Sequence, residues 1–492
     1  MKRTTTESCI LTLPLRPEKW QYDKLETDFR IGCQIYNCLR RETWNRYNQM
    51  IRTKRWKATL AQSESAEERK ALFEQQKQLR KEYRLSEYAF HADVKKYQQH
   101  FSRNINSSVA QKLATSLWKA YEKLFFSNGN TVHFCRLDDF RSIEGKRNDS
   151  GIVFRNGVLM YGPHLSMRIQ VGANPKDQYQ MDMLSKPVKY CRILRKWVGT
   201  KWKYYLQLVL QGKPSCKVCP DTGIPKHSLG HSRVGIDIGV QTVAVVADNA
   251  VMLRELAPEV ENISAQLRRI ERAMDRSRRA TNPDAFRSDG TYIKGKRIAN
   301  RSNNYKQLAA KYRDLHRRQA AIRKQSHECL ANEVLALGAE IYIEDMNFSG
   351  LQRRAQETII KPNGKFATKR RFGKLLANKS PAEFVAILQR KLDAAHGKMT
   401  MVSTYATKAS QYNHLTQLYS KKKLSMRMNI MPDGRKIQRD LYSAFLLQCT
   451  NNTYDGFDQT LCDSKYNNFV NLHDLEIARL RTNTHNLSSM GV

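Results

Sequence analysis

Residues 233–256, RVGIDIGVQTVAVVADNAVMLREL, decide the fold expected for the second half of this chain. Their apolar runs, interrupted by Gly239, predict a buried strand, a glycine turn and a second strand. Asp237 lies inside the first run, where burying a carboxylate is costly unless something neutralises its charge. A divalent cation does this well, and the nearby glycines leave room for a substrate backbone to approach. Asp237 is therefore a candidate metal ligand.

Two later acids also stand beside apolar segments. Glu344 closes the predicted strand IYIE after a long periodic helix at about 302–337, and Asp440 opens the predicted helix at 437–449. Taken alone, each acid has an ordinary structural interpretation. Asp237 matches the phosphate turn of sugar-kinase or actin-like folds, Glu344 an exposed strand end, and Asp440 a helix N-cap. Together, they are the residue type that holds two Mg²⁺ ions for phosphodiester cleavage.

The composition indicates a nucleic-acid partner. The chain has 492 residues, enough for several structural units, and its 85 Lys and Arg against 46 Asp and Glu give a formal charge of +39. Such a charge repels itself unless a polyanion neutralises it, and phosphate binding also releases counterions. An anionic membrane is the alternative polyanion, but the charge is spread along the whole chain. With no long apolar stretch and no signal peptide, we expect a cytoplasmic protein.

The N-terminal half predicts a β domain interrupted by helices. Residues 7–14 are typical of a strand, and a clear amphipathic helix lies at 107–126. The segments 151–162 and 196–212 are typical of hairpins, the first with Asn-Gly at its turn. We expect the early strand to pair with this later β region, which makes the helical segment an insertion.

The expected division of the chain follows from these changes in pattern. The N-terminal part comprises the first strand of the β domain (1–15), a helical domain (16–130), the β unit (131–212) and a linker (213–232). The C-terminal part comprises a first carboxylate region with a helical hairpin (233–351), a basic segment with a helix and strand (352–407), a short nucleic-acid-binding segment (408–436), and a last carboxylate region with a tail (437–492).

Three motifs give the sequence a family resemblance. GIDIGVQTVAVVAD (235–248), IYIEDMNFSGL (341–351) and RDLYSAFL (439–446) resemble, in this order, the three RuvC motifs of the TnpB family and its descendants, the compact type V CRISPR effectors. The resemblance implies an α/β plus α+β multidomain fold, with a RuvC (RNase H-like) nuclease domain and an N-terminal β-barrel-like wedge domain carrying a helical recognition domain. It places the catalytic, metal-binding acids of that family on Asp237, Glu344 and Asp440.

The same resemblance implies an activity and its partners. Members of this family are RNA-guided DNA endonucleases, so a guide RNA and target DNA are the expected partners, and the protein itself would read a short DNA motif beside the target. RuvC cleavage implies Mg²⁺, for which Mn²⁺ can substitute. The expected location is the bacterial cytoplasm, in association with the nucleoid. The oligomeric state does not follow from the sequence.

The segment 408–436 departs from the family pattern. Members usually carry two CxxC pairs between the second and third motifs, but here Tyr412 and Leu415 stand where one pair would be, and the second pair is missing too. A structural zinc is therefore not expected at this place, and packing or nucleic acid must order the segment. Cys216 and Cys219 form an isolated CxxC, which we interpret as reduced loop cysteines because a zinc site needs a second pair of ligands. The alternative is a zinc site completed by His227 and His231 at irregular spacing.

Two basic clusters flank the second and third acids. One lies in 352–379, where Phe366 and Phe372 alternate with cations, and the other lies in 421–427. Cations bind phosphate, and aromatic rings stack on single-stranded bases, so we predict nucleic-acid contacts here; a solvated charge run is the alternative. The predicted contact residues are Arg353, Arg354, Lys369, Arg370, Arg371, Lys374, Lys421, Lys422, Lys423 and Arg427.

Other functions remain to be separated from a Mg²⁺-dependent endodeoxyribonuclease. A nuclease-inactive, RNA-guided DNA-binding repressor is disfavoured because all three acids are present. A transposase that acts directly on transposon ends usually needs its own nucleophile, and no HUH-like histidine pair is present. A guide-independent resolvase of the RuvC type is disfavoured by the length and charge of the chain.

Overall fold

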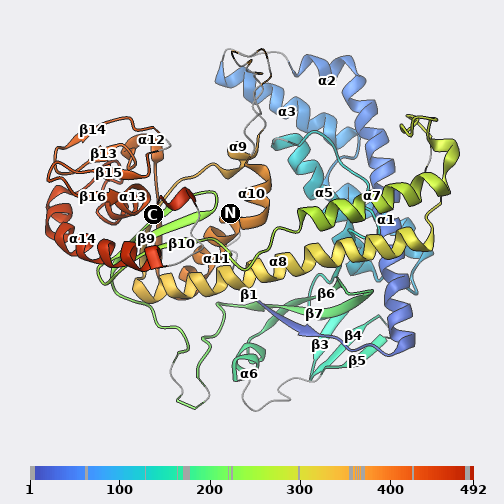
Figure 1. Cartoon of the computed structure of the whole chain (residues 1–492). Coiled ribbons are helices and arrows are strands. Elements are labelled where there is room, and N and C mark those ends of the chain that lie inside the picture. Colours follow the sequence, from blue (N-terminus) through green and yellow to red (C-terminus); the bar gives the residue numbers. More distant parts are fainter. Residues whose placement is uncertain are drawn as a thin grey trace. The chain divides into compact units, whose positions relative to one another are not determined.

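The computed structural model divides the chain into two compact units, 1–224 and 225–492 (Figure 1). The residues that it describes are 6–60, 65–127, 129–162, 165–169, 178–219, 221–222, 225–296, 298, 300–353, 358, 360, 362, 364, 366, 372–423, 426–482 and 488–491.

The first unit is a β structure interrupted by helices. Its four-stranded sheet has the order β1-β7-β6-β2, and a second sheet has the order β3-β4-β5. The strands are β1 (Ser8–Pro14), β2 (Ser142–Glu144), β3 (Ile152–Arg155), β4 (Val158–Tyr161), β5 (Leu165–Arg168), β6 (Val188–Val198) and β7 (Lys201–Gln211). The helices are α1 (Lys19–Arg52), α2 (Lys54–Ala58), α3 (Ala66–Glu82), α4 (Glu87–His100), α5 (Ser107–Phe126) and α6 (Gln178–Leu184).

The predicted pairing of the first strand is confirmed. β1 pairs antiparallel with β7 along its whole length, from Ser8 opposite Gln211 to Pro14 opposite Tyr205. Five helices separate β1 from the remaining strands, as expected for an insertion. The two hairpins expected in 151–162 and 196–212 are also present, as β3–β4 and β6–β7. Closure of these two sheets into a barrel stays a prediction.

The second unit is built on a five-stranded mixed sheet. Its strands are β8 (Arg233–Ile238), β9 (Thr242–Ala247), β10 (Ala250–Glu255), β11 (Glu340–Glu344) and β12 (Lys398–Val402), in the order β10-β9-β8-β11-β12. The first three form an antiparallel meander, whereas β11 runs parallel to both β8 and β12. The carboxyl ends of the three parallel strands therefore meet at one edge of the sheet.

Helices cover both faces of this sheet. The longer helices of this unit are α7 (Ser264–Thr281), α8 (Asn303–Leu337), α11 (Pro381–Ala394), α13 (Arg439–Gln448) and α14 (Gln459–Thr482). The short helices are η1 (Pro283–Ala285), α9 (Phe348–Gln352), α10 (Gly373–Lys379), α12 (Thr404–Thr407) and η2 (Ser488–Met490). One face packs with α13 and α14, and the other with α8 and α11. The sequence analysis described the residues after the helix at 437–449 only as a tail, whereas the structure has the long helix α14 there.

The segment 408–436 folds as two small hairpins. They are β13 (Tyr412–Asn413) with β14 (Leu418–Tyr419), and β15 (Met428–Ile430) with β16 (Lys436–Gln438). His414 is fully buried and fixes the first hairpin to α13, because the Tyr442 hydroxyl accepts from the His414 backbone N–H at 3.0 Å and bonds its ring Nδ1 at 2.7 Å. The absence of zinc stays a prediction, but packing of this kind supplies an anchor.

The Tyr442 hydroxyl should be worth a measurable part of the stability of this unit. We expect Tyr442→Phe to lower the free energy of unfolding by about 1–3 kcal/mol, because it leaves a buried backbone N–H without an acceptor. Denaturant unfolding measures the change. Tyr466→Phe is the matched control, since the buried Tyr466 hydroxyl has no hydrogen-bond partner among the described residues. Equal effects of the two substitutions would contradict the anchor.

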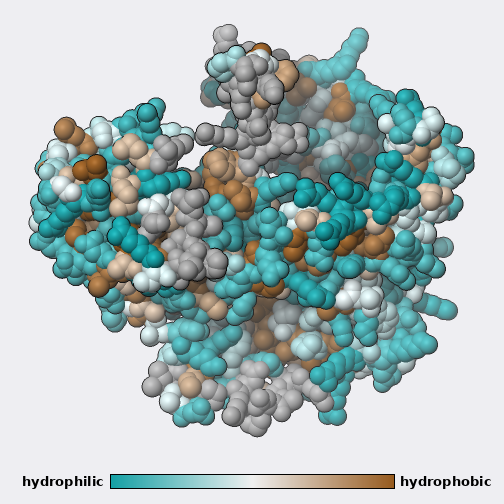
Figure 2. All heavy atoms as spheres, in the orientation of Figure 1, coloured by the Kyte–Doolittle hydropathy of each residue, from teal (hydrophilic) through white to brown (hydrophobic). Residues whose placement is uncertain are grey.

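The surface is mostly polar. Figure 2 shows one face on which hydrophilic side chains predominate and hydrophobic ones are scattered in small groups, as a charge of +39 leads one to expect. In the part of the chain that the structure describes, no helix combines the length and the apolar character needed to cross a membrane.

Candidate nuclease site

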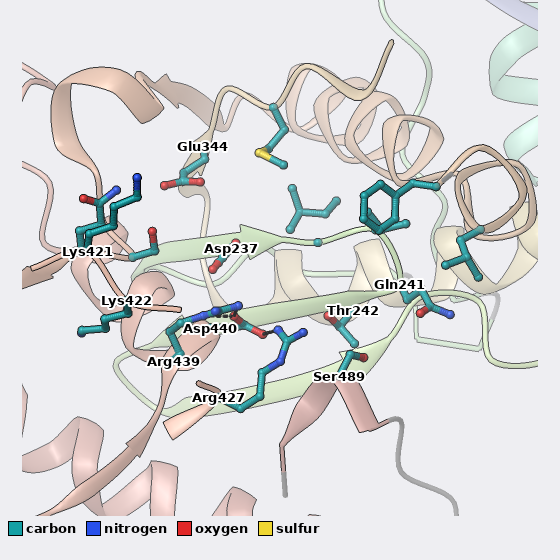
Figure 3. A pocket seen from close by; sticks show the side chains of 18 residues that line it. Asp237, Gln241, Thr242, Glu344, Lys421, Lys422, Arg427, Arg439, Asp440 and Ser489 are labelled. Carbon is teal, nitrogen blue, oxygen red and sulfur yellow. Dashed lines mark hydrogen bonds and ion pairs between the residues drawn. The ribbon is translucent and has the colours of Figure 1, made fainter. Parts of the chain in front are cut away.

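A cavity of about 630 Å³ lies at the carboxyl edge of the parallel strands in the second unit. All three acids singled out from the sequence line it, together with the glycine turn after β8, the start of α10 and the residues that precede α13 (Figure 3). The charged and hydroxyl side chains that line the cavity include Asp237, Glu344, Lys421, Lys422, Arg427, Arg439, Asp440 and Ser489.

The register of two parallel strands brings Asp237 and Glu344 together. Ile236 of β8 lies opposite Ile343 of β11. Asp237 and Glu344 are the next residues along these strands, so the same register places them side by side. Neighbouring residues on paired strands share a face of the sheet, so both carboxylates lie at the same edge and on the same side.

A close approach of α13 brings the third acid over this face. A Cβ atom at Gly235 would lie only 1.9 Å from the carbonyl oxygen of Ala444 and 2.4 Å from the backbone N of Gln448, so only glycine lets the helix rest on β8. Asp237 is two residues further along the strand and shares the face of Gly235. Asp440 stands one turn before Ala444, which places it at the same end.

Burial acts on both strand acids, and repulsion by the other two carboxylates acts on Asp237. The pKa of Asp237 is raised well above its ordinary value, first by burial and then by the neighbouring Glu344 and Asp440, while Arg439 and a hydrogen bond with Ser443 lower it. Burial also raises the pKa of Glu344. The charged forms of both acids are therefore unfavourable unless a cation approaches them.

Asp440 is held differently, by neutral and cationic donors. Arg439 donates from Nε and Nη2 to Oδ1 at 3.1 and 3.0 Å, and the Gln438 amide donates to Oδ2 at 3.3 Å. Arg427 Nη1 lies 4.0 Å from Oδ2. The interpretation of Asp440 as an N-cap is wrong: the N-cap is Gln438, whose Oε1 accepts from Leu441 N at 2.7 Å, and Asp440 lies in the first turn.

The donor set fits a hard divalent cation in its chemistry. Three carboxylates line one cavity, and the two on the strands carry raised pKa values that a cation would relieve. Among the described residues, however, no three or more His, Cys, Asp or Glu side chains are grouped closely enough to hold a metal ion as they stand. Binding of one ion by all three acids therefore requires their side chains to draw closer together, and the arginine on Asp440 would compete with the ion.

Cations line the same cavity and could hold a phosphate. Lys421, Lys422 and Arg427, three of the predicted contact residues, lie here, and Lys422 Nζ donates to Asn429 Oδ1 at 2.9 Å. Burial and the neighbouring Arg439 lower the pKa of Lys422. Sequence analysis missed Arg439, although its place directly before Asp440 was a usable signal.

Three other predicted contacts are described by the structure but do not line the cavity. Arg353 and Lys374 are exposed at the end of α9 and on α10, and Lys423 is exposed beside the two cavity lysines. Their role in binding nucleic acid stays a prediction. Arg354, Lys369, Arg370 and Arg371 lie outside the described residues.

Comparisons with known proteins give only distant likenesses. No family model and no curated protein matches the sequence. A chain of the Cas12f1–sgRNA–target DNA complex is 11% identical, with 91% of this chain and 99% of that chain covered and a TM-score of 0.41. A chain of a CRISPR-Cas12f ternary complex is also 11% identical, with 88% and 85% covered and a TM-score of 0.27. TM-scores this low carry no weight for fold or activity.

The contact between β8 and α13 can be tested at Gly235. We expect Gly235→Ala to lower the free energy of unfolding by about 3 kcal/mol, because the new methyl group meets helix backbone that cannot give way. Circular dichroism during denaturation measures the change. Gly373→Ala is the control, since a Cβ there meets nothing within 4 Å. A Gly235→Ala protein as stable as the control would contradict the close approach.

The raised pKa of Asp237 makes metal-free stability depend on pH. A group whose folded pKa lies above its unfolded value binds more protons in the folded state, so the stability that it contributes is lost as pH rises through the folded pKa. Asp237→Asn removes this loss. At neutral pH and in the presence of a chelator, we expect the melting temperature of the variant to exceed that of the wild type by about 2 °C or more. This shift corresponds to a gain of about 1 kcal/mol in the free energy of unfolding.

The gain should shrink at acidic pH, where Asp237 is protonated in both states. Scanning calorimetry between acidic and neutral pH makes this comparison. A gain that is the same at all pH values, or a loss at neutral pH, would contradict the raised pKa.

Proposed function

We propose that this protein is a metal-dependent endonuclease that cuts DNA under the guidance of an RNA. The observation that carries the proposal is one cavity that combines the Asp237, Glu344 and Asp440 carboxylates with four cationic side chains. The sheet supports it as well. Three antiparallel strands followed by two parallel ones, in the order β10-β9-β8-β11-β12, is the arrangement of RNase H-like domains, to which RuvC nucleases belong.

The division of labour in the cavity follows from its charges. Asp237, Glu344 and Asp440 would hold Mg²⁺ ions, which supply an activated water and stabilise the leaving oxygen of a phosphodiester. Lys421 and Lys422 neutralise and orient the phosphate group, and Arg427 and Arg439 can join them when Asp440 no longer needs neutralising. The cavity thus offers carboxylates to a metal ion and cationic side chains to a phosphate.

Guidance by RNA rests on other observations. The three sequence motifs resemble those of TnpB proteins and compact type V effectors, and the charge of +39 suits a chain that binds more nucleic acid than a single cut site offers. A guide RNA would select the target by base pairing, while the protein reads a short motif beside it.

The catalytic assignment can be tested by substitution. We expect Asp237→Asn and Glu344→Gln each to reduce plasmid cleavage in Mg²⁺ by about 100-fold or more, since the developing charge loses its stabilisation, while binding to guide and target persists. Gel analysis of a guide-matched plasmid measures the loss. Asp345→Asn is the matched control, because this neighbouring acid is exposed and does not line the cavity. Unchanged cleavage by Asp237→Asn would exclude the assignment.

Sequencing the RNA that copurifies with the protein tests the guidance. A single defined RNA with a variable end is the expected result, and a heterogeneous mixture of cellular RNA would contradict it. Wild-type protein that binds the matched target but does not cut it in Mg²⁺ or Mn²⁺ would favour the RNA-guided repressor. Cleavage of transposon ends without any RNA would favour the transposase.

A further inference from the structure

The segment 488–491, which contains η2, reaches the wall of the nuclease cavity. Ser489 lines the cavity, and its hydroxyl oxygen is buried without a hydrogen-bond partner among the described residues. Met490 is 4% exposed and packs into the apolar cluster that includes α13 and α14. The segment is thus built into the second unit at the end of α13 that bears Asp440.

Gln438 connects this segment to Asp440. Its side chain is fully buried, and both ends are used: Oε1 caps α13 at Leu441 N, while Nε2 donates to Met490 O at 3.1 Å and to Asp440 Oδ2 at 3.3 Å. Its backbone N–H donates to His473 Nε2 of α14 at 3.0 Å. The amide therefore has a fixed orientation, and the Met490 carbonyl is one of the groups that fix it.

Arg427, the other group beside Oδ2, also contacts the segment. Gly491 has a φ of +69°, and a Cβ atom there would lie 2.2 Å from the Cβ of Arg427. The backbone at 491 thus lies directly against Arg427, whose Nη1 is 4.0 Å from Asp440 Oδ2. Among the described residues, the two groups found beside Oδ2 both contact this short segment, whereas Arg439 donates to Oδ1.

We propose that the segment 488–491 positions the Asp440 carboxylate for catalysis, acting through Gln438 and Arg427, and that Gln438 is a positioning residue of the site. The inference rests on the nuclease function proposed above. A carboxylate with both oxygens held keeps one orientation. The amide of Gln438 holds Oδ2 without adding a positive charge of its own beside Asp440.

The first test removes the amide donor and keeps the helix cap. Gln438→Glu retains the acceptor for Leu441 N but loses the N–H bonds to Asp440 and Met490. We expect kcat for DNA cleavage at neutral pH to fall about 10-fold or more while the affinity for target DNA is unchanged. Cleavage should recover partly as pH falls, because the new carboxyl, once protonated, donates to Oδ2 again.

Gln448→Glu is the matched control. This amide, near the other end of α13, is likewise buried and likewise donates to a carboxylate, that of Asp248, at 2.8 Å, but it lies two turns from Asp440. A merely structural loss would affect the two variants alike and would not change the pH profile of the reaction. Equal losses, or a Gln438→Glu enzyme with wild-type kcat and pH profile, would overturn the inference.

The second test displaces the segment without changing any charge. Gly491→Ala forces the backbone away from Arg427, and we expect Mn²⁺ affinity in the absence of DNA, measured by calorimetry, to fall about 10-fold. Gly434→Ala is the control, since Gly434 also has a positive φ of +81° but a Cβ there meets nothing within 4 Å. Equal Mn²⁺ affinity of the two variants would count against the segment.

The two proposals fail in different ways. A wild-type protein that cuts no DNA would refute the nuclease function, and the Mn²⁺ titration would still report whether the segment orders Asp440. A wild-type protein that cuts DNA normally, together with normal variants at 438 and 491, would refute the positioning role alone.

Discussion

A close backbone approach in the second unit, α13 resting on β8 at Gly235, is the constraint on which the site depends. A helix and a strand seldom come so near, because a Cβ atom stands between them. Here the missing side chain lets the first turn of the helix lie over the end of the strand. The parallel register of β8 and β11 supplies two acids, and this contact supplies the third. Neither arrangement alone makes a three-acid site.

A cluster of acids assembled in this way must be neutralised, and protons and arginines within the site do part of this. The two strand acids have raised pKa values, and Asp440 is paired with arginine. The same cavity thus contains cationic side chains that can bind a phosphate and carboxylates that can bind a cation, and some of these side chains pair with one another. Substrate and metal would compete with these internal contacts, which suggests that they bind together more readily than either binds alone.

The sequence predicted those parts of the fold that follow from local pattern. The strand at Asp237, the strand that ends at Glu344 and the helix at Asp440 are present, because apolar runs and turn residues are local signals. The four strands of 412–438 were missed because each has only two or three residues, too few for a period to show. α14 was missed although Cys462, Phe469, Val470, His473 and Ile477 are buried at helical spacing. The contacts of Gln438 and the place of Ser489 in the cavity wall arise only from packing, which pattern does not reveal.

The helix that bears Asp440 is buried on all sides after its first turn begins. Every residue of α13 from Leu441 to Gln448 is buried, so the helix has no solvent-facing side on which to loosen. Its amide protons should therefore exchange with solvent only when the whole second unit opens, among the slowest in the chain. A site carried by such an element cannot be switched by local melting. Control over it must come from what is allowed to enter the cavity.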